Sequence, residues 1–198
     1  MNRHQNNMEL LLANATTGQI STMHTETDKA YIDVPDTWIF LADGKHFLIT
    51  SEKDGYNHIY MYDLKGNLVK QITTGNYDVV RIAGIDEKNK KIYYTSKESS
   101  PINTDLYVIN FDGKKKTKLS DKPGTYSASF SNGCHYYISN FTDANTPPIY
   151  TIHNAKGKQL VMLQDNASLA KKMKEYGNET KTFGTLTTSE GISLNYYI

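Results

Sequence analysis

Short apolar runs separated by glycine-centred turns recur along the whole chain. The turns at Gly18, Gly66, Gly113 and Gly157 lie 48, 47 and 44 residues apart, each between two runs rich in β-branched and aromatic residues. A period in the forties with several short strands per period is typical of a β-propeller, in which each repeat folds into one four-stranded blade.

Further landmarks keep nearly the same period. Apolar segments at 44–51, 89–96 and 133–139 each start at a turn and end on a serine, and these serines lie 45 and 43 residues apart. A second apolar run follows each segment, at 59–62, 106–109 and 149–152. An inner strand precedes each pair, ending at Phe40, Ile85 or Phe130, and an outer strand follows near 68–73, 117–119 or 160–163. Each repeat therefore holds four strands.

We predict an all-β fold: a partial β-propeller of about three and a half four-stranded antiparallel blades over residues 1–165, then one short helix and a β-hairpin. The blades are expected at about 1–27, 28–75, 76–122 and 123–165. Because a closed ring needs about four to eight blades, we expect the chain to be part of a longer propeller. A β-sandwich also has short strands, but it does not predict a four-strand register that repeats.

The pattern changes after the last repeat. Apolar residues spaced as on one helical face lie between a polar cap and a glycine: Asp165 or Asn166 as the cap, Leu169, Met173 and Tyr176 on the face, and Gly177 as the stop. Two strands at 182–187 and 192–198 then flank a turn, and we expect them to begin a further domain. Since an incomplete ring leaves open sheet edges, we expect the chain to self-associate, or this hairpin to fold back on the first blade.

Composition favours strands and narrows the function classes. The chain has 15 Tyr against 5 Pro and one Trp, and its formal net charge of +1 gives no general attraction to nucleic acid. The run Lys114-Lys115-Lys116 is expected in a solvated turn, and the lone Cys134 as a small buried filler. No apolar run is long enough to span a membrane.

Catalytic motifs are missing from the sequence. It contains no G-x-S-x-G nucleophile elbow, no phosphate-binding loop and no H-E-x-x-H zinc motif. The 6 histidines are scattered and never form a ligand-spaced pair. We therefore predict no catalytic residue, no metal site and no cofactor within these residues.

Several segments together resemble one family. They are Asn2-Arg3-His4-Gln5-Asn6, the stretches at 41–47, 50–60 and 91–96, Tyr126-Ser127-Ala128-Ser129-Phe130, Thr146-Pro147-Pro148-Ile149-Tyr150 and 163–167. In order and spacing they are similar to the propeller domain of bacterial dipeptidyl peptidase IV, in the prolyl oligopeptidase family. The closing hairpin resembles the point where that propeller hands over to an α/β-hydrolase domain.

The resemblance implies a non-catalytic propeller segment of a serine exopeptidase that releases N-terminal X-Pro or X-Ala dipeptides. In that family the propeller walls the active-site chamber and restricts access to short, unstructured peptides. The catalytic triad belongs to the hydrolase domain, expected after residue 198. The glutamate pair and arginine that hold the substrate belong to blades expected before residue 1. The complete enzyme is expected to be periplasmic or secreted.

One loop carries the candidate substrate contacts. The segment 31–35 precedes an inner strand and corresponds to a family loop that approaches the substrate pocket. Its residues differ from the aromatic-arginine version of that loop, and Tyr31 and Asp33 are the substrate-proximal candidates, against a plain loop. The alternative function, from another class, is a stand-alone β-propeller-like or sandwich module that binds protein or glycan.

Overall fold

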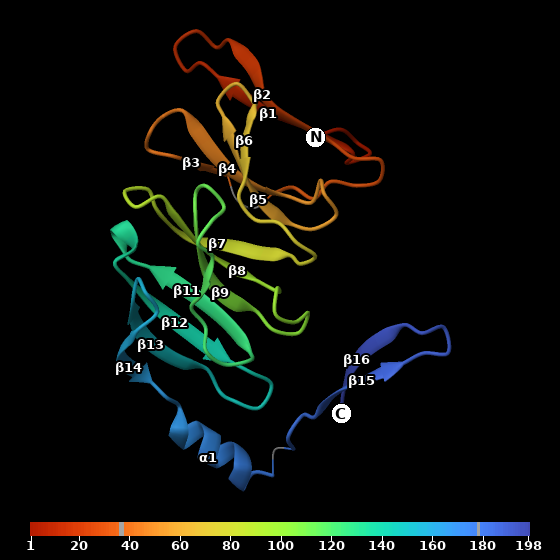
Figure 1. Cartoon of the computed structure of the whole chain (residues 1–198), viewed down its shortest axis with the longest axis vertical. Helices are drawn as coiled ribbons and strands as arrows, with labels where there is room; N and C mark the ends of the chain where they lie inside the picture. The colour runs from red at the N-terminus through yellow and green to blue at the C-terminus, as the bar shows by residue number, and fades with distance from the viewer. Residues whose placement is uncertain (36–37, 178) are drawn as a thin grey trace.

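The computed structural model describes residues 1–35, 38–177 and 179–198 (Figure 1). The strands are β1 (Asn7–Ala13), β2 (Ile20–Thr27), β3 (Trp38–Phe40), β4 (His46–Ser51), β5 (His58–Asp63), β6 (Leu68–Gln71), β7 (Val79–Asp86), β8 (Lys91–Ser96), β9 (Asp105–Asn110), β10 (Thr117–Lys118), β11 (Thr125–Phe130), β12 (Tyr136–Thr142), β13 (Ile149–Asn154), β14 (Gln159–Gln164), β15 (Phe183–Thr187) and β16 (Ser193–Tyr197). One α-helix, α1 (Ala167–Glu175), and a short 3₁₀ turn, η1 (Asn132–Cys134), complete the elements of the described residues.

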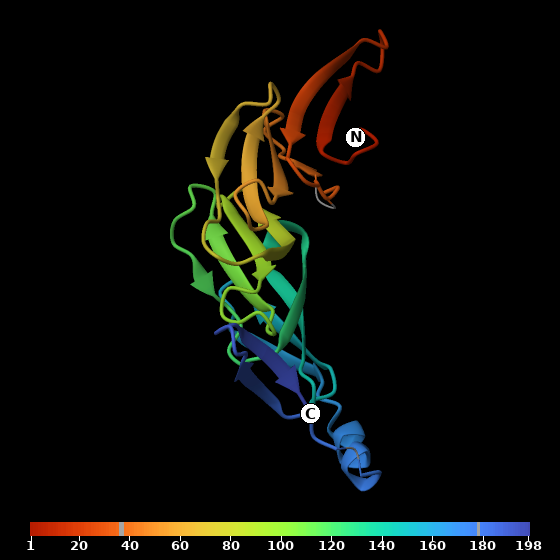
Figure 2. The ribbon, with the colours of Figure 1, turned by 90° about the vertical axis from the view of Figure 1, so that its right-hand side faces the viewer.

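The strands form antiparallel sheets in simple chain order. Three sheets have four strands each, β3-β4-β5-β6, β7-β8-β9-β10 and β11-β12-β13-β14, and β1 pairs with β2 in a smaller sheet before them. Figures 1 and 2 show these sheets following one another along the molecule, with α1 projecting beyond the last. The predicted all-β fold, with four-stranded blades, one short helix and a final hairpin, is confirmed.

The hydrophobic core lies between neighbouring sheets. Leu48, Ile59, Ile92 and Tyr94, all fully buried, belong to one cluster that joins the second and third sheets. A second cluster joins the first two sheets and a third joins the last two. Strand β8 is buried from Ile92 to Ser96 because it has a sheet on each face. This double burial explains why the strands are continuous apolar runs rather than alternating ones.

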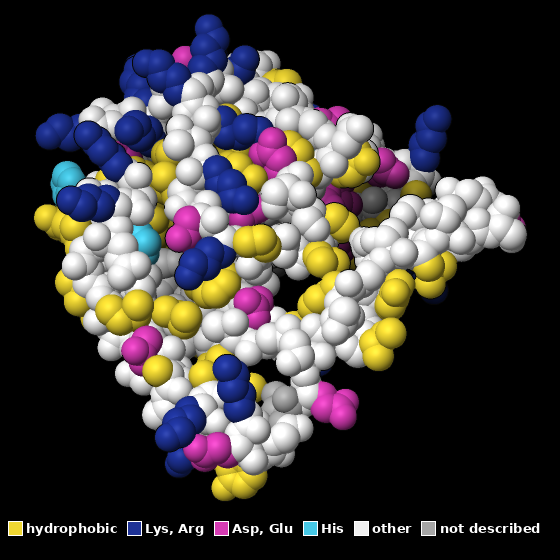
Figure 3. Space-filling view, turned by 60° about the horizontal axis from the view of Figure 1, so that its bottom comes forward, with side chains coloured by type: hydrophobic (Ala, Val, Ile, Leu, Met, Phe, Trp, Pro, Cys, Tyr) yellow, Lys and Arg dark blue, Asp and Glu magenta, His cyan; other side chains and the backbone are white. Residues whose placement is uncertain are grey.

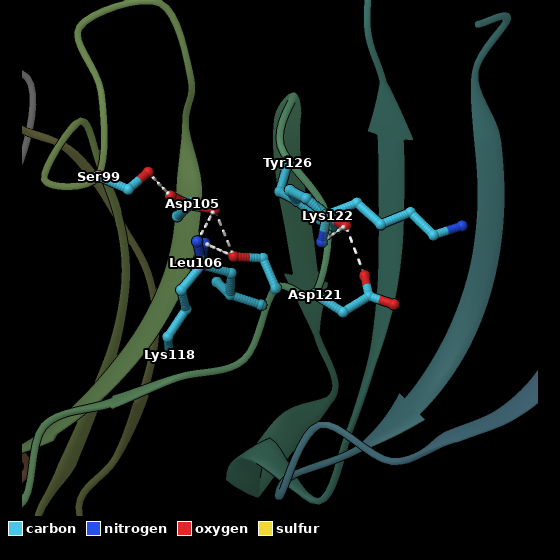
Figure 4. A network of polar contacts seen from close by, with 8 residues as sticks. Ser99, Asp105, Leu106, Lys118, Asp121, Lys122 and Tyr126 are labelled. Carbon is cyan, nitrogen blue, oxygen red and sulfur yellow. Dashed lines mark hydrogen bonds and ion pairs between the residues drawn. The ribbon is translucent and has the colours of Figure 1, made fainter.

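Buried polar groups at the start of β9 and of β5 tie these third strands to the end of their own sheets, and Figure 4 shows the group at β9. Asp105 begins β9 and is fully buried, and it accepts hydrogen bonds from Ser99 Oγ, Ser120 Oγ (2.7 Å) and Lys118 Nζ (2.9 Å). Burial alone would raise the pKa of this carboxyl, but the hydrogen bonds from Ser99, Lys118 and Ser120 outweigh it and hold the pKa below its ordinary value. His58 begins β5 in the same way, with Nδ1 3.1 Å from Thr73 Oγ1.

The glycine period has a packing cause. Gly66 has φ +82, and a Cβ built there would lie 2.3 Å from the carbonyl oxygen of Met23 in the preceding sheet. The corresponding Cβ at Gly113 would lie 3.0 Å from the carbonyl oxygen of Ile72, again in the preceding sheet. The turns at Gly66 and Gly113 therefore rest against the backbone of the neighbouring sheet, and only a residue without a side chain permits that approach.

The C-terminal segment leaves the sheets through α1. The carboxylate of Asp165 accepts the Ala167 amide (3.0 Å), and Gly177, at φ +69, ends the helix as predicted. The β15–β16 hairpin lies near the fourth sheet, so the prediction that it folds back on the first blade is wrong. The physical reason is a pair of hydrogen bonds that holds the segment before the hairpin to the β12–β13 loop. Asn145 Nδ2 donates to the Lys181 carbonyl (3.0 Å), and Lys181 N donates to Asn145 Oδ1 (2.8 Å).

The structure also shows the surroundings of Cys134 and of the lysine run at 114–116. Cys134 is buried, and burial raises the pKa of its thiol, which fits the predicted filler. Lys116 pairs with Glu98 beside Tyr77 and Tyr107, whereas Lys114 and Lys115 are exposed in the turn. Among the described residues, no helix has the length and apolar character needed to cross a membrane.

The close approach at Gly66 predicts a mutational difference. Gly66→Ala adds a methyl group against the Met23 carbonyl, and we expect it to cost about 1–3 kcal/mol more in unfolding free energy than a matched Gly→Ala change in open space. Gly44→Ala is that match, since Gly44 has φ +64 and nothing within 4 Å of its Cβ position, and it should cost only about 1 kcal/mol. Urea unfolding of both variants measures the difference. Equal losses would show that the turn does not rest on the neighbouring sheet.

Candidate functional site

The candidate loop is fixed to the first sheet by one buried residue. Ile32 is only 5% exposed, packs in the core between the first two sheets, and donates its amide to the Gln5 carbonyl (2.7 Å). In an extended segment, neighbouring side chains point away from the buried one. Tyr31 (52% exposed) and Asp33 accordingly stand in solvent on either side of Ile32.

Tyr31 and Asp33 line one cavity of about 530 Å³. Its other walls come from the end of β2, from the loop between β4 and β5, and from the start of β7. That loop is held to β7 by Asn57, whose amide donates to Asp78 Oδ1 (2.9 Å) and whose Nδ2 donates to the Val79 carbonyl (2.7 Å). The cavity thus lies where the first, second and third sheets meet.

One wall of the cavity is acidic. Glu26, Asp33 and Glu52 line it together. Burial raises the pKa of Glu52, and the negative charges of Asp33, Asp78 and Glu26 raise it further. For Glu26, burial raises the pKa, but the nearby His24 imidazole and the hydrogen bond from Ser51 outweigh it and the pKa is lowered. The wall therefore carries negative charge that favours a cationic or hydrogen-bond-donating guest.

Two cations stand in the same cavity. Lys53 Nζ donates to Tyr62 OH (2.6 Å) and lies 4.0 Å from the centre of the Tyr60 ring, so its position is fixed. Arg81, on β7, is exposed and also lines the cavity. The site presents both signs of charge within one hollow, which suits the backbone and termini of a peptide.

No nucleophile is set up in this cavity. Ser51 Oγ donates directly to Glu26 Oε1 (2.6 Å), and His24 lies on the far side of that carboxylate, with Nε2 3.7 Å from Oε2. A serine nucleophile needs the imidazole between hydroxyl and acid, and here the order is different. Among the described residues, no group of three or more His, Cys, Asp or Glu is arranged to hold a metal ion.

The family is decided by a model that covers most of the chain. The model described as "Dipeptidyl peptidase IV (DPP IV) N-terminal region" matches residues 1–148. The chain belongs to this family.

Curated relatives of this DPP IV segment are named as dipeptidyl peptidases. The probable dipeptidyl peptidase 4 of Arthroderma benhamiae is 33% identical over 177 residues, which cover 82% of this chain and 23% of that protein. The dipeptidyl peptidase 4 of Trichophyton rubrum is 32% identical over 164 residues, covering 80% and 21%. The chain spans about a quarter of the length of the curated relatives it matches.

Solved structures agree with the fold. The dipeptidyl peptidase 4 of Porphyromonas gingivalis superposes with a TM-score of 0.92 at 35% identity, over 100% of this chain and 28% of that one. A putative dipeptidyl aminopeptidase IV from Bacteroides ovatus superposes with a TM-score of 0.82 at 23% identity, over 99% and 31%, and supports the fold alone. The predicted resemblance to the DPP IV propeller is confirmed.

Sequence reasoning found the loop but not the rest of the cavity. Glu26 was missed because nothing in the local pattern shows that the end of β2 borders the hollow. Glu52 follows β4 and Arg81 lies in β7 of the next sheet, so no short sequence motif contains both residues. The one available signal was the four-strand repeat, which places the starts and ends of successive sheets side by side.

The shared cavity predicts a coupled titration. Asp33→Asn removes a negative charge that holds the pKa of Glu52 above its ordinary value, so the Glu52 pKa should fall. NMR titration of the Glu52 side chain measures this shift. Asp143→Asn makes the same change at a different hollow and should leave the Glu52 pKa unchanged. An unchanged Glu52 pKa in the Asp33 variant would show that the Asp33 charge does not act on Glu52.

Proposed function

We propose that this segment forms part of the wall of the substrate chamber in a serine exopeptidase that releases X-Pro and X-Ala dipeptides from peptide N-termini. The observation that carries the proposal is the cavity lined by Tyr31 and Asp33 within a chain of the DPP IV N-terminal family. The segment contributes binding groups and no catalytic ones. The proposed enzyme is periplasmic or secreted, as the family resemblance implies.

In this proposal, which rests on the family resemblance, the segment and the rest of the longer protein have different roles. The triad lies in a hydrolase domain of the longer protein, after residue 198, and the glutamate pair that holds the substrate amine lies in blades before residue 1. The segment supplies packed sheets, which resist deformation because their interiors are close-packed. A rigid wall excludes folded proteins and admits extended peptides.

The cavity groups suit contact with an extended peptide. Tyr31 offers an exposed ring with a hydroxyl, Asp33 and Glu52 accept hydrogen bonds from amides or amines, and Arg81 binds a carbonyl or carboxylate. Such contacts act on ground state and transition state alike, because they lie away from the scissile bond. They therefore lower KM and leave kcat nearly unchanged.

Steady-state kinetics of the complete enzyme test the proposal. We expect Tyr31→Ala combined with Asp33→Asn to raise KM for a peptide longer than the released dipeptide by about tenfold, with kcat changed less than about twofold. Tyr176→Ala, at an exposed position on the linker after α1, should change neither value. The isolated 198-residue chain should release no product from a Gly-Pro chromogenic substrate.

Two results would overturn the proposal in different ways. Turnover by the isolated chain would place catalytic groups inside it. A fall in kcat at constant KM in the double variant would assign the cavity to the chemistry rather than to substrate access.

A further inference from the structure

Lysines collect at one end of the sheets. In each four-stranded sheet, the turn from the first to the second strand and the turn from the third to the fourth lie at the same end, because the strands alternate in direction. The turns of neighbouring sheets touch: Ala42 N donates to Glu87 Oε2 (2.7 Å) across 45 residues. Exposed lysines occupy these turns, among them Lys45, Lys65, Lys90, Lys115, Lys156 and Lys158.

Two carboxylates of the same turns are held by hydrogen bonds from the turn itself. Asp43 accepts the amides of Lys45 and His46 and lies 2.6 Å from His46 Nδ1. Asp63 accepts the amides of Lys65 and Asn67 together with the Asn67 side chain. These hydrogen bonds lower the pKa of both carboxyls and hold them against the turn backbone.

The turn lysines are exposed, and they outnumber the exposed acids of the same turns, Asp43, Glu87 and Asp112. Within the described residues, the ion pairs that involve lysine use Lys116, Lys118 and Lys171, and none uses the six turn lysines named above. Figure 3 shows the Lys and Arg side chains gathered along the upper left of the molecule, away from the hairpin at the right. Since stacked sheets lie roughly 10 Å apart, the basic turns repeat at about that spacing.

The loops at the opposite end carry more acids than bases. They contribute Glu26, Asp28, Asp33 and Glu52 to the cavity described above, against Lys53 and Arg81. The chain has 22 Lys and Arg against 21 Asp and Glu, so its net charge is small although basic groups gather at one end and acidic groups at the other. Such a distribution orients a molecule at a charged surface even when its total charge is close to zero.

We propose that the lysine-bearing turns are a docking surface for an anionic lipid membrane. The basic positions form a broad array over successive sheets, which fits a flat surface carrying many negative headgroups. Apolar side chains stand beside the lysines: Phe40 is 54% exposed just before one turn, and Leu68 is 51% exposed just after another. Lysines next to exposed apolar groups suit a lipid interface better than a nucleic acid or an acidic polysaccharide.

Vesicle binding by the full 198-residue chain tests the proposal. The chain should sediment with vesicles rich in phosphatidylglycerol and not with pure phosphatidylcholine, and added salt should weaken binding. Lys65→Gln, Lys115→Gln and Lys158→Gln each remove one charge from a different turn, and the three changes are also combined in one triple variant. Each should weaken vesicle binding by about fivefold. Circular dichroism confirms that the variants remain folded.

A matched triple variant separates this surface from the basic helix. Lys122→Gln, Lys172→Gln and Lys174→Gln together remove the same charge from a loop and from α1, and should leave vesicle binding within about twofold of the original. An equal loss in both triples would overturn the assignment to the turns. Binding to heparin or DNA without binding to phosphatidylglycerol vesicles would overturn the assignment to lipid.

Discussion

Face-to-face packing of neighbouring sheets is the constraint on which the rest of this structure depends. No sheet here buries both faces alone, and strand β8 is covered on both sides only because a sheet stands before and after it. The turns centred on Gly66 and Gly113 lie against the backbone of the preceding sheet, so the spacing between sheets is set by backbone contact as well as by side chains. At Gly66 and Gly113 the glycine of the sequence repeat permits that contact.

The cavity is a consequence of this packing. The end of β2, the loop before β5 and the start of β7 meet because three successive sheets are stacked in register. The charges in the cavity then act on one another, as the raised pKa of Glu52 beside Asp33 shows. In the proposed function these groups bind substrate, and the packed sheets hold them in place. The lysine-bearing turns at the other end follow from the same alternation of strand direction.

Local pattern was sufficient to predict the strands, the helix and the fold class. The inner strands were placed to end near Phe40, Ile85 and Phe130, and the structure ends them at Phe40, Asp86 and Phe130. Ile32 was not recognised as the anchor of the candidate loop, because its partner Gln5 lies far away along the chain, in the turn before β1. The position of the hairpin was predicted wrongly for a similar reason. A single side chain, Asn145, holds the segment before it, and nothing in the hairpin sequence encodes that contact.

Native-state hydrogen exchange tests the central claim, that the stacked sheets stabilise one another as a unit. Amides of β4 and β8, which lie in different sheets and are buried throughout most of their length, should exchange most slowly and with nearly the same opening free energy. Amides of the exposed β15–β16 hairpin should exchange far faster. If β4 and β8 open with clearly different free energies, or as readily as the hairpin, the sheets are independent and the account is contradicted.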